Sequence, residues 1–77
     1  MNDLVKNIDK LHTTWMGELR IKKNLHIDTD VIEYCKNKIL DKGCVIIKNG
    51  KNYYCAVDNI VITVNAESFT IITAKRA

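Results

Sequence analysis

The chain has 77 residues, a formal net charge of +3 and a hydrophobic fraction of 47%. These values predict a single globular domain over residues 1–77 and argue against disorder. A membrane span needs about 18 apolar residues in a row, and no such run exists, so we expect no membrane association. The N-terminal segment lacks the apolar stretch of a signal peptide, so we expect a cytoplasmic location. The basic excess is too small to identify a dedicated nucleic-acid-binding protein.

No motif for a metal or a cofactor is present. The three cysteines, Cys35, Cys44 and Cys55, are odd in number and widely spaced, which favours reduced thiols over disulfides. A zinc site would need a close pair such as C-x-x-C, and a phosphate-binding loop would need clustered glycines. We therefore expect neither a metal nor a cofactor.

The N-terminal part of the chain predicts helices. Apolar residues spaced three and four apart indicate a short helix over residues 2–11 and a second over residues 14–25. In the second helix we expect Trp15, Met16 and Leu19 to face the core. Both helices would then cover one face of a sheet.

A third helix is predicted to begin at Thr29 or Asp30. Asp30 and Glu33 have the spacing of a capping box, with Asp in place of the usual Ser or Thr. Lys42 and Gly43 predict its end, because a basic last turn suits the helix dipole and glycine can adopt a positive φ.

The C-terminal part predicts four short antiparallel strands that follow one another as a meander. Asn49-Gly50 favours a type I′ hairpin turn after a first strand that is apolar enough to be buried on both faces. Asp58-Asn59 predicts a second tight turn. In the fourth strand, simple alternation places Ile71 and Thr73 on the same face.

The predicted architecture is therefore α+β, with two to three N-terminal helices packed on a four-stranded antiparallel β-meander. The helical part spans residues 1–43 and the sheet spans residues 44–77. Whether the second face of the sheet is covered by helices, by a second copy or by a ligand stays open. A homodimer is one alternative, since a chain this short has a small core.

The sequence holds few groups for catalysis. With two histidines and one serine, metal-independent RNA cleavage is the reaction that fits best, because it needs only an acid, a base and cations on the phosphate. His12 precedes a basic helix in which Arg20 lies about two turns further on. Arg20 is suited to hold a phosphate in a bidentate fashion. A histidine in such a position is more often a cap or loop residue than a catalyst.

Three segments resemble a known family. They are LHTTWMGELRIKKNL at 11–25, IIKNGKNYY at 46–54 and ITVNAESFTIITA at 62–74. They are similar to domain of unknown function 3781, a family of short bacterial proteins, and the resemblance covers nearly the whole chain. It implies a stand-alone cytoplasmic protein and no established activity.

A second similarity concerns the fold. Helices followed by a four-stranded antiparallel sheet resemble the barnase, EndoU, colicin and RelE-like ribonuclease superfamily, whose phage-associated members pair an early histidine with a terminal T-A motif. This likeness implies a catalytic set of His12, Arg20, Thr73 and Lys75, with Lys75 standing where such members have His or Tyr.

The nucleic-acid contacts that would accompany this set are the basic and polar residues Lys22, Lys23, Lys51, Tyr53 and Asn65. Two functions follow as alternatives. One is an RNA-binding or endoribonuclease-like domain, and the other is a non-catalytic module that binds a protein partner, such as a phage or mobile-element inhibitor or regulator.

Overall fold

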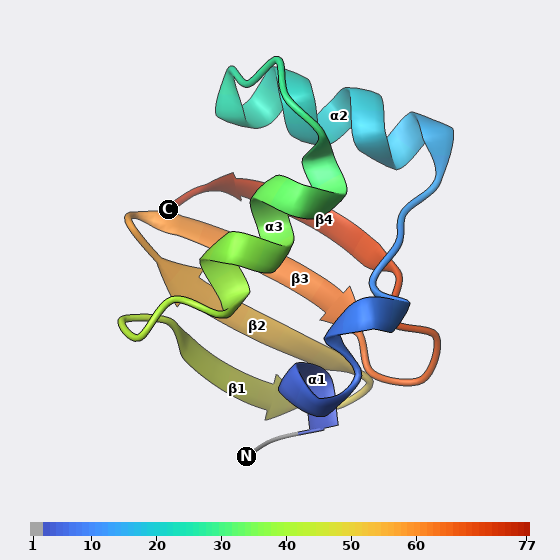
Figure 1. The fold of residues 1–77 in the computed structure, drawn as a ribbon, viewed down its shortest axis with the longest axis vertical. Coiled ribbons are helices and arrows are strands. Elements are labelled where there is room, and N and C mark those ends of the chain that lie inside the picture. Colours follow the sequence, from blue (N-terminus) through green and yellow to red (C-terminus); the bar gives the residue numbers. More distant parts are fainter. Residues whose placement is uncertain (1–2) are drawn as a thin grey trace.

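The structure is a computed structural model that describes residues 3–77. Its elements, in chain order, are α1 (Asp3–Lys6), the 3₁₀ helix η1 (Ile8–Lys10), α2 (Trp15–Leu25), α3 (Val31–Ile39), β1 (Val45–Asn49), β2 (Asn52–Val57), β3 (Ile60–Asn65) and β4 (Ile71–Arg76). Within the described chain the strands form one antiparallel sheet in the order β1-β2-β3-β4. The predicted α+β class and the meander are therefore confirmed (Figure 1).

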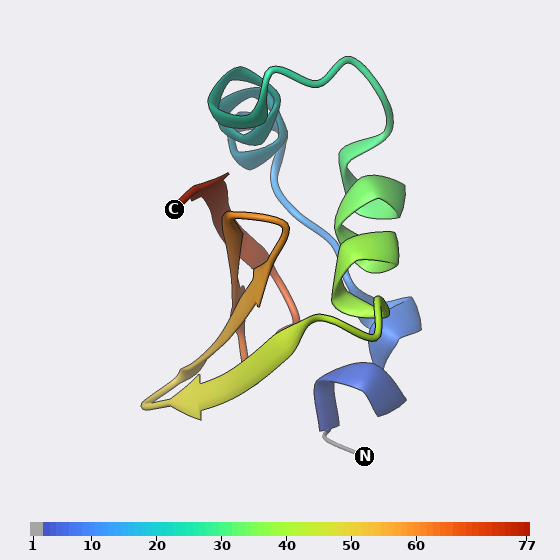
Figure 2. The ribbon, with the colours of Figure 1, turned by 90° about the vertical axis from the view of Figure 1, so that its left-hand side faces the viewer.

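The helices lie on one side of the sheet. Figure 2 shows α1 and α3 against one face and α2 beside β4, while the opposite face of residues 3–77 carries no helix. Alternation along β2 and β3 directs Cys55, Ile62 and Val64 toward the helices, and all three are fully buried. The core thus lies between the helices and one face of the sheet.

The first predicted helix is interrupted. Residues 2–11 divide into α1 and η1, and residue 2 lies outside the described part of the chain. Asn7 adopts φ −110° and ψ 25° between the two pieces, and its side-chain amide donates to the Asp3 carbonyl at 2.8 Å. This local bond competes with the helical pattern, which explains the break.

Helix α2 forms where it was predicted, but its orientation was predicted wrongly. Thr14 caps it by accepting a hydrogen bond from the Gly17 amide at 3.0 Å. The buried stripe is Gly17, Ile21 and Leu25, at spacings of four residues. The residues expected in the core instead point to solvent: Trp15, Met16 and Leu19.

The orientation of α2 has a steric reason at Gly17. A Cβ at this position would overlap the Thr13 hydroxyl oxygen and would lie 3.1 Å from the Thr14 hydroxyl oxygen. The Thr13 hydroxyl in turn donates to the Ile71 carbonyl of β4 at 2.8 Å. Glycine therefore lets α2 approach its own N-terminal segment and β4 closely.

Helix α3 begins as predicted and ends earlier. The Asp30 carboxylate accepts from the amides of Ile32 at 2.9 Å and Glu33 at 3.1 Å, which confirms the N-cap. The helix ends at Ile39, and Gly43 does not have a positive φ. Its amide instead donates to the Asp41 carboxylate at 2.7 Å, so a side-chain turn replaces the predicted glycine cap.

Strand β1 is not buried on both faces, contrary to the prediction. It lies at the edge of the sheet, and Val45 and Ile47 are exposed while Ile46 is half-buried. The helices cover one face only, so the apolar residues of the other face stay accessible (Figure 2).

The first hairpin turn differs from the prediction, and the predicted second tight turn at Asp58-Asn59 is confirmed. Asn49 pairs with Asn52, so the first turn is Gly50-Lys51, and Gly50 has φ +64° while Lys51 has no positive φ. This pattern matches a type II′ turn rather than type I′. Asp58 and Asn59 have φ +50° and +62°, which are the two positive values that a type I′ turn requires.

A bulge separates Ile71 from Thr73. The register shifts between Thr63 and Val64, so that Thr73 pairs with Thr63 while Ile71 pairs with Val64. Ile71 therefore faces the core and Thr73 faces the opposite side, against the simple alternation predicted for β4. Ile72 is the additional residue at this bulge.

Candidate functional site

His12 is held at the beginning of β4. Its backbone forms a short parallel bridge with Thr70. The ring Nδ1–H donates to the Lys10 carbonyl at 2.8 Å, since a carbonyl oxygen can only accept. In the neutral ring, Nε2 then accepts from the Thr70 hydroxyl at 3.0 Å. Both ring nitrogens of His12 are thus engaged within the protein.

The hydrogen bond between His12 and Thr70 is part of a network that extends into the β3–β4 loop. The Thr70 and Ser68 hydroxyls lie 2.7 Å apart. The Asn65 side-chain carbonyl accepts from the amides of Glu67 at 3.0 Å and Ser68 at 2.9 Å. Asn65, a predicted nucleic-acid contact, therefore organises this loop in the manner typical of asparagine in turns.

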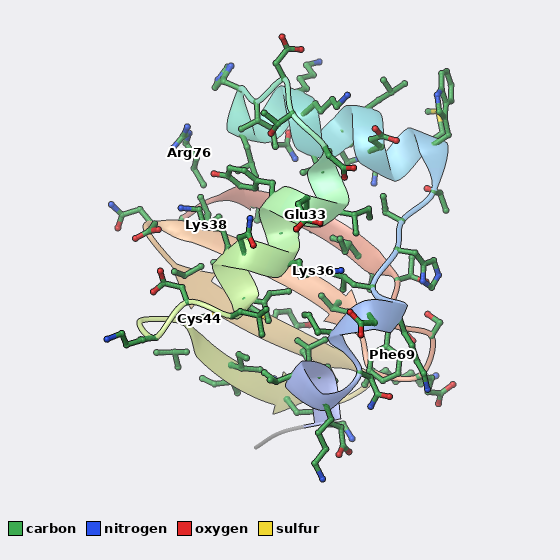
Figure 3. The ribbon with its side chains drawn as sticks, viewed as in Figure 1. Glu33, Lys36, Lys38, Cys44, Phe69 and Arg76 are labelled. Carbon is green, nitrogen blue, oxygen red and sulfur yellow. The ribbon has the colours of Figure 1, made fainter. Side chains whose placement is uncertain are left out.

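Phe69 and Lys10 close the same loop. Phe69 has φ +60°, and the Lys10 ammonium lies 6.0 Å from the centroid of its ring. Figure 3 shows Phe69 directed toward the N-terminal segment that contains η1. A dense set of bonds around His12 thus fixes a loop, and it leaves no free ring nitrogen for a substrate.

The other residues of the predicted catalytic set lie elsewhere. Thr73 and Lys75 are on the sheet face opposite the helices, where they pair with Thr63 and Val61. Arg20 is exposed on α2. The structure brings Thr73 and Lys75 to one face, and it links His12 to Thr70 rather than to any other member of the set. The catalytic assignment stays a prediction.

The predicted nucleic-acid contacts are also dispersed. Lys22 and Lys23 are on α2, where Lys22 pairs with Glu18 at 3.5 Å. Lys51 is exposed in the β1–β2 turn, and its carbonyl accepts from the Ala66 amide of the β3–β4 loop at 2.7 Å. Tyr53 faces the helices and is 4% exposed, so its side chain is not on the surface.

Two exposed surfaces have a stronger claim to function. The first, called the α2 outer surface, consists of residues on the solvent side of that helix: Trp15, Met16, Leu19, Arg20, Lys22 and Lys23. Trp15 is 72% exposed, Met16 is 60% exposed and Leu19 is 46% exposed. An aromatic and two aliphatic side chains therefore adjoin three cations on the same helix.

The second, called the open sheet face, lies opposite the helices. Its residues follow from the register of the four strands: Val45, Ile47, Asn49, Asn52, Tyr54, Ala56, Val61, Thr63, Asn65, Thr73 and Lys75. The exposed fractions are 56% for Val45, 59% for Ile47 and 38% for Tyr54. Within residues 3–77, Lys75 is the one charged residue of this face.

The sequence contained a signal for both surfaces. Gly17, Ile21 and Leu25 form an i, i+4, i+8 stripe that places Trp15 and Leu19 on the outside of α2. This stripe was missed because glycine is not counted as an apolar residue. The open sheet face was missed because an apolar first strand was interpreted as a strand buried on both sides.

The cysteine thiols lie toward the core. Cys35 and Cys55 are fully buried, Cys44 is half-buried, and all three are free. Burial raises the pKa of the Cys35 and Cys55 thiols to about 12. Among residues 3–77, no group of three or more His, Cys, Asp or Glu side chains is arranged to hold a metal ion.

Neither an enclosed site nor a membrane helix is found in the described chain. Residues 3–77 form no pocket. None of the helices described is both long and apolar enough to cross a membrane.

Comparison with known proteins gives one match. The model of a family described as "Protein of unknown function (DUF3781)" matches residues 5–75. No curated protein and no solved structure matches the chain, and the similarity to the ribonuclease superfamily therefore gains no support.

Proposed function

Because the chain belongs to the DUF3781 family, whose description assigns no activity, we propose a function from its surface: a non-catalytic module that binds a protein partner through the α2 outer surface. The partner would offer an apolar groove with an acidic rim. The proposal rests chiefly on one observation, the 72% exposure of Trp15 next to Met16 and Leu19.

Exposed residues of these types are unusual on a free surface. Tryptophan, methionine and arginine are enriched at the centres of protein interfaces, and tryptophan and arginine dominate their binding energy. Trp15 and Leu19 are separated by one helical turn and therefore lie one above the other. A helix that presents such a stripe fits the helix-in-groove mode of recognition.

The charges of α2 favour an acidic partner. Arg20 and Lys23 are exposed, and Glu18, which is paired with Lys22 at 3.5 Å, offsets one of the three cations. Two positive charges therefore adjoin the apolar stripe. Carboxylates at the rim of a partner groove would steer association and set its orientation.

The ribonuclease alternative is less well supported by the geometry. It needs His12 and Arg20 to act on one phosphate together with Thr73 and Lys75. His12 has both ring nitrogens in hydrogen bonds, and the pairing of β4 with β3 places Thr73 and Lys75 on the open sheet face. RNA binding to the α2 outer surface, with a base stacked on Trp15, is retained as an outcome of the test.

The test is affinity capture from a lysate of the organism that encodes the chain, followed by titration of the purified captured protein. We expect Trp15→Ala/Leu19→Ala to weaken the binding of that protein at least about 100-fold. The matched control is Leu40→Ala, since Leu40 is 48% exposed at the end of α3 and is not part of the α2 outer surface. This variant should bind like the wild type.

Two results would contradict the proposal. Capture that disappears after nuclease treatment of the lysate, or cleavage of total RNA in EDTA that His12→Ala abolishes, would favour the nucleic-acid alternative. Capture that is equal for the wild type and the double variant would show that the α2 outer surface is not the binding surface.

A further inference from the structure

The open sheet face carries exposed apolar residues, Val45, Ile47 and Tyr54, that no helix of residues 3–77 covers (Figure 2). We infer that it binds a second copy of the same chain, so that two sheets pack face to face in a symmetric dimer. The inference does not depend on the proposed function, because that function uses α2 and leaves the open sheet face free.

Two rows of this face resemble a sandwich core, and a third row, Asn49, Asn52 and Asn65, is polar and uncharged. Val45 and Ile47 from β1 lie in line with Ala56 and Tyr54 of β2, and the next strand continues the rows with Val61 and Thr63. β-Branched and aromatic side chains in cross-strand rows are those that two packed sheets interdigitate. Thr63 lies in the middle of these rows and is nearly buried, with an exposed fraction of 9%.

Charge selects a second copy over other occupants. A homodimer with two-fold symmetry places the same patch on both sides, so a strongly charged patch would repel itself. The open sheet face avoids this, because Lys75 is its one charged residue among residues 3–77 and lies on the edge strand β4. From that edge a lysine can reach solvent at the rim of the interface. A nucleic acid would require several cations here.

The area that a specific dimer needs is a small part of the surface. Interfaces at the lower end of the standard range bury about 600 Å² per copy, which is roughly one eighth of the 4954 Å² surface. The sheet lies across a broad side of a body that measures 30 × 24 × 21 Å, as Figure 1 shows from the helix side.

The first experiment measures the oligomeric state of the full chain by sedimentation and by size exclusion with light scattering. We expect a mass twice the chain mass of 8.8 kDa. Ile47→Glu should weaken the dimer at least about 100-fold, because it places two charges inside an apolar interface. Leu40→Glu, on the helix side of the sheet, should remain dimeric. Circular dichroism checks folding, and Ile47→Thr, which keeps the strand propensity, replaces any variant that does not fold.

A second experiment identifies the face. Ala56→Cys places an exposed thiol on the open sheet face, in the central strand β2 between Val45 and Val61, and stacked sheets lie about 10 Å apart. A short bismaleimide should therefore join two copies of this variant, whereas Leu40→Cys should give no cross-linked dimer. A wild-type monomer, a dimer that persists in Ile47→Glu, or a dimer that Ala56→Cys fails to cross-link would each overturn the inference.

Discussion

The α2 outer surface and the open sheet face are both apolar and exposed, but they differ in charge. Arg20 and Lys23 adjoin the apolar stripe of α2, whereas Lys75 is the one charged residue of the open sheet face within the described chain. A basic surface repels its own copy and attracts an acidic partner, while a neutral surface tolerates a copy of itself. Charge, rather than apolar area, therefore distinguishes the surface proposed to bind a partner from the surface proposed to bind a second copy.

This comparison requires that the outer side of α2 contribute little to the stability of the fold. Mutations on the buried side and on the exposed side of α2 test that requirement. Ile21 is fully buried while Leu19 is 46% exposed. We expect Ile21→Ala to lower the free energy of unfolding by about 2–5 kcal/mol, because it leaves a cavity in the core. Leu19→Ala should change it by less than about 0.5 kcal/mol.

Chemical denaturation of both variants measures these values. A large loss for Leu19→Ala would mean that the outer side of α2 contributes to the fold. Its exposure would then no longer indicate a partner.

The next largest effect concerns the contact that orients α2. In an ordinary helix interior, Gly→Ala stabilises by up to about 1 kcal/mol. Here we expect Gly17→Ala to destabilise by about 1–3 kcal/mol, because the new methyl group would displace the Thr13 hydroxyl from the Ile71 carbonyl.

Thermal or urea unfolding distinguishes these signs. In a Thr13→Ala background the clash is absent, so Gly17→Ala should cost less there than in the wild type. A stabilised Gly17→Ala protein would contradict the steric account of the orientation of α2.

The sequence predicted the architecture well because local rules determine most of it. The Asp30 cap, the Thr14–Leu25 helix and the four strands follow from capping, periodicity and turn residues, all of which act over a few positions. The side of α2 that is buried depends instead on Thr13, Gly17 and β4 coming together. The stripe of Gly17, Ile21 and Leu25 indicates that side only when glycine is counted among the buried residues.

The candidate site was harder to predict for the same reason. His12 was selected for its chemistry, yet its role depends on Thr70, which lies 58 residues away in the sequence and contributes one hydrogen bond at 3.0 Å. The exposure of β1 likewise depends on which face of the sheet the helices cover. Packing between segments far apart in the sequence decides the role of His12 and the exposure of β1. The composition of a short segment gives no information about such packing.

Salt provides a direct test of the difference in charge. We expect the Kd of a partner bound through the α2 outer surface to rise about tenfold between low and high ionic strength, since screening weakens exposed charge pairs. The dimer formed through the open sheet face should change by less than about threefold, because apolar burial does not weaken with salt.

Titration calorimetry and sedimentation at several salt concentrations measure the two constants. Arg20→Glu should remove most of the salt dependence of partner binding while leaving the dimer unchanged. Equal salt sensitivity of the two associations would remove the distinction between the surfaces.

The smallest effect at neutral pH concerns the thiols on the core side of the sheet, opposite the open sheet face. The pKa of the Cys35 and Cys55 thiols is raised by burial from its ordinary value of 9.0 to about 12. Between these values the unfolded chain loses thiol protons before the folded chain does, so the free energy of unfolding should fall as pH rises through this window. Burial also raises the pKa of Tyr53, which adds a contribution of the same sign.

Urea unfolding from neutral to alkaline pH measures the slope, and Cys35→Ala should make it shallower whatever its cost in stability at neutral pH. A slope that is unchanged in this variant would mean that the Cys35 thiol has the same pKa in the folded and unfolded states. Water would then reach the helix side of the sheet more readily than its burial indicates.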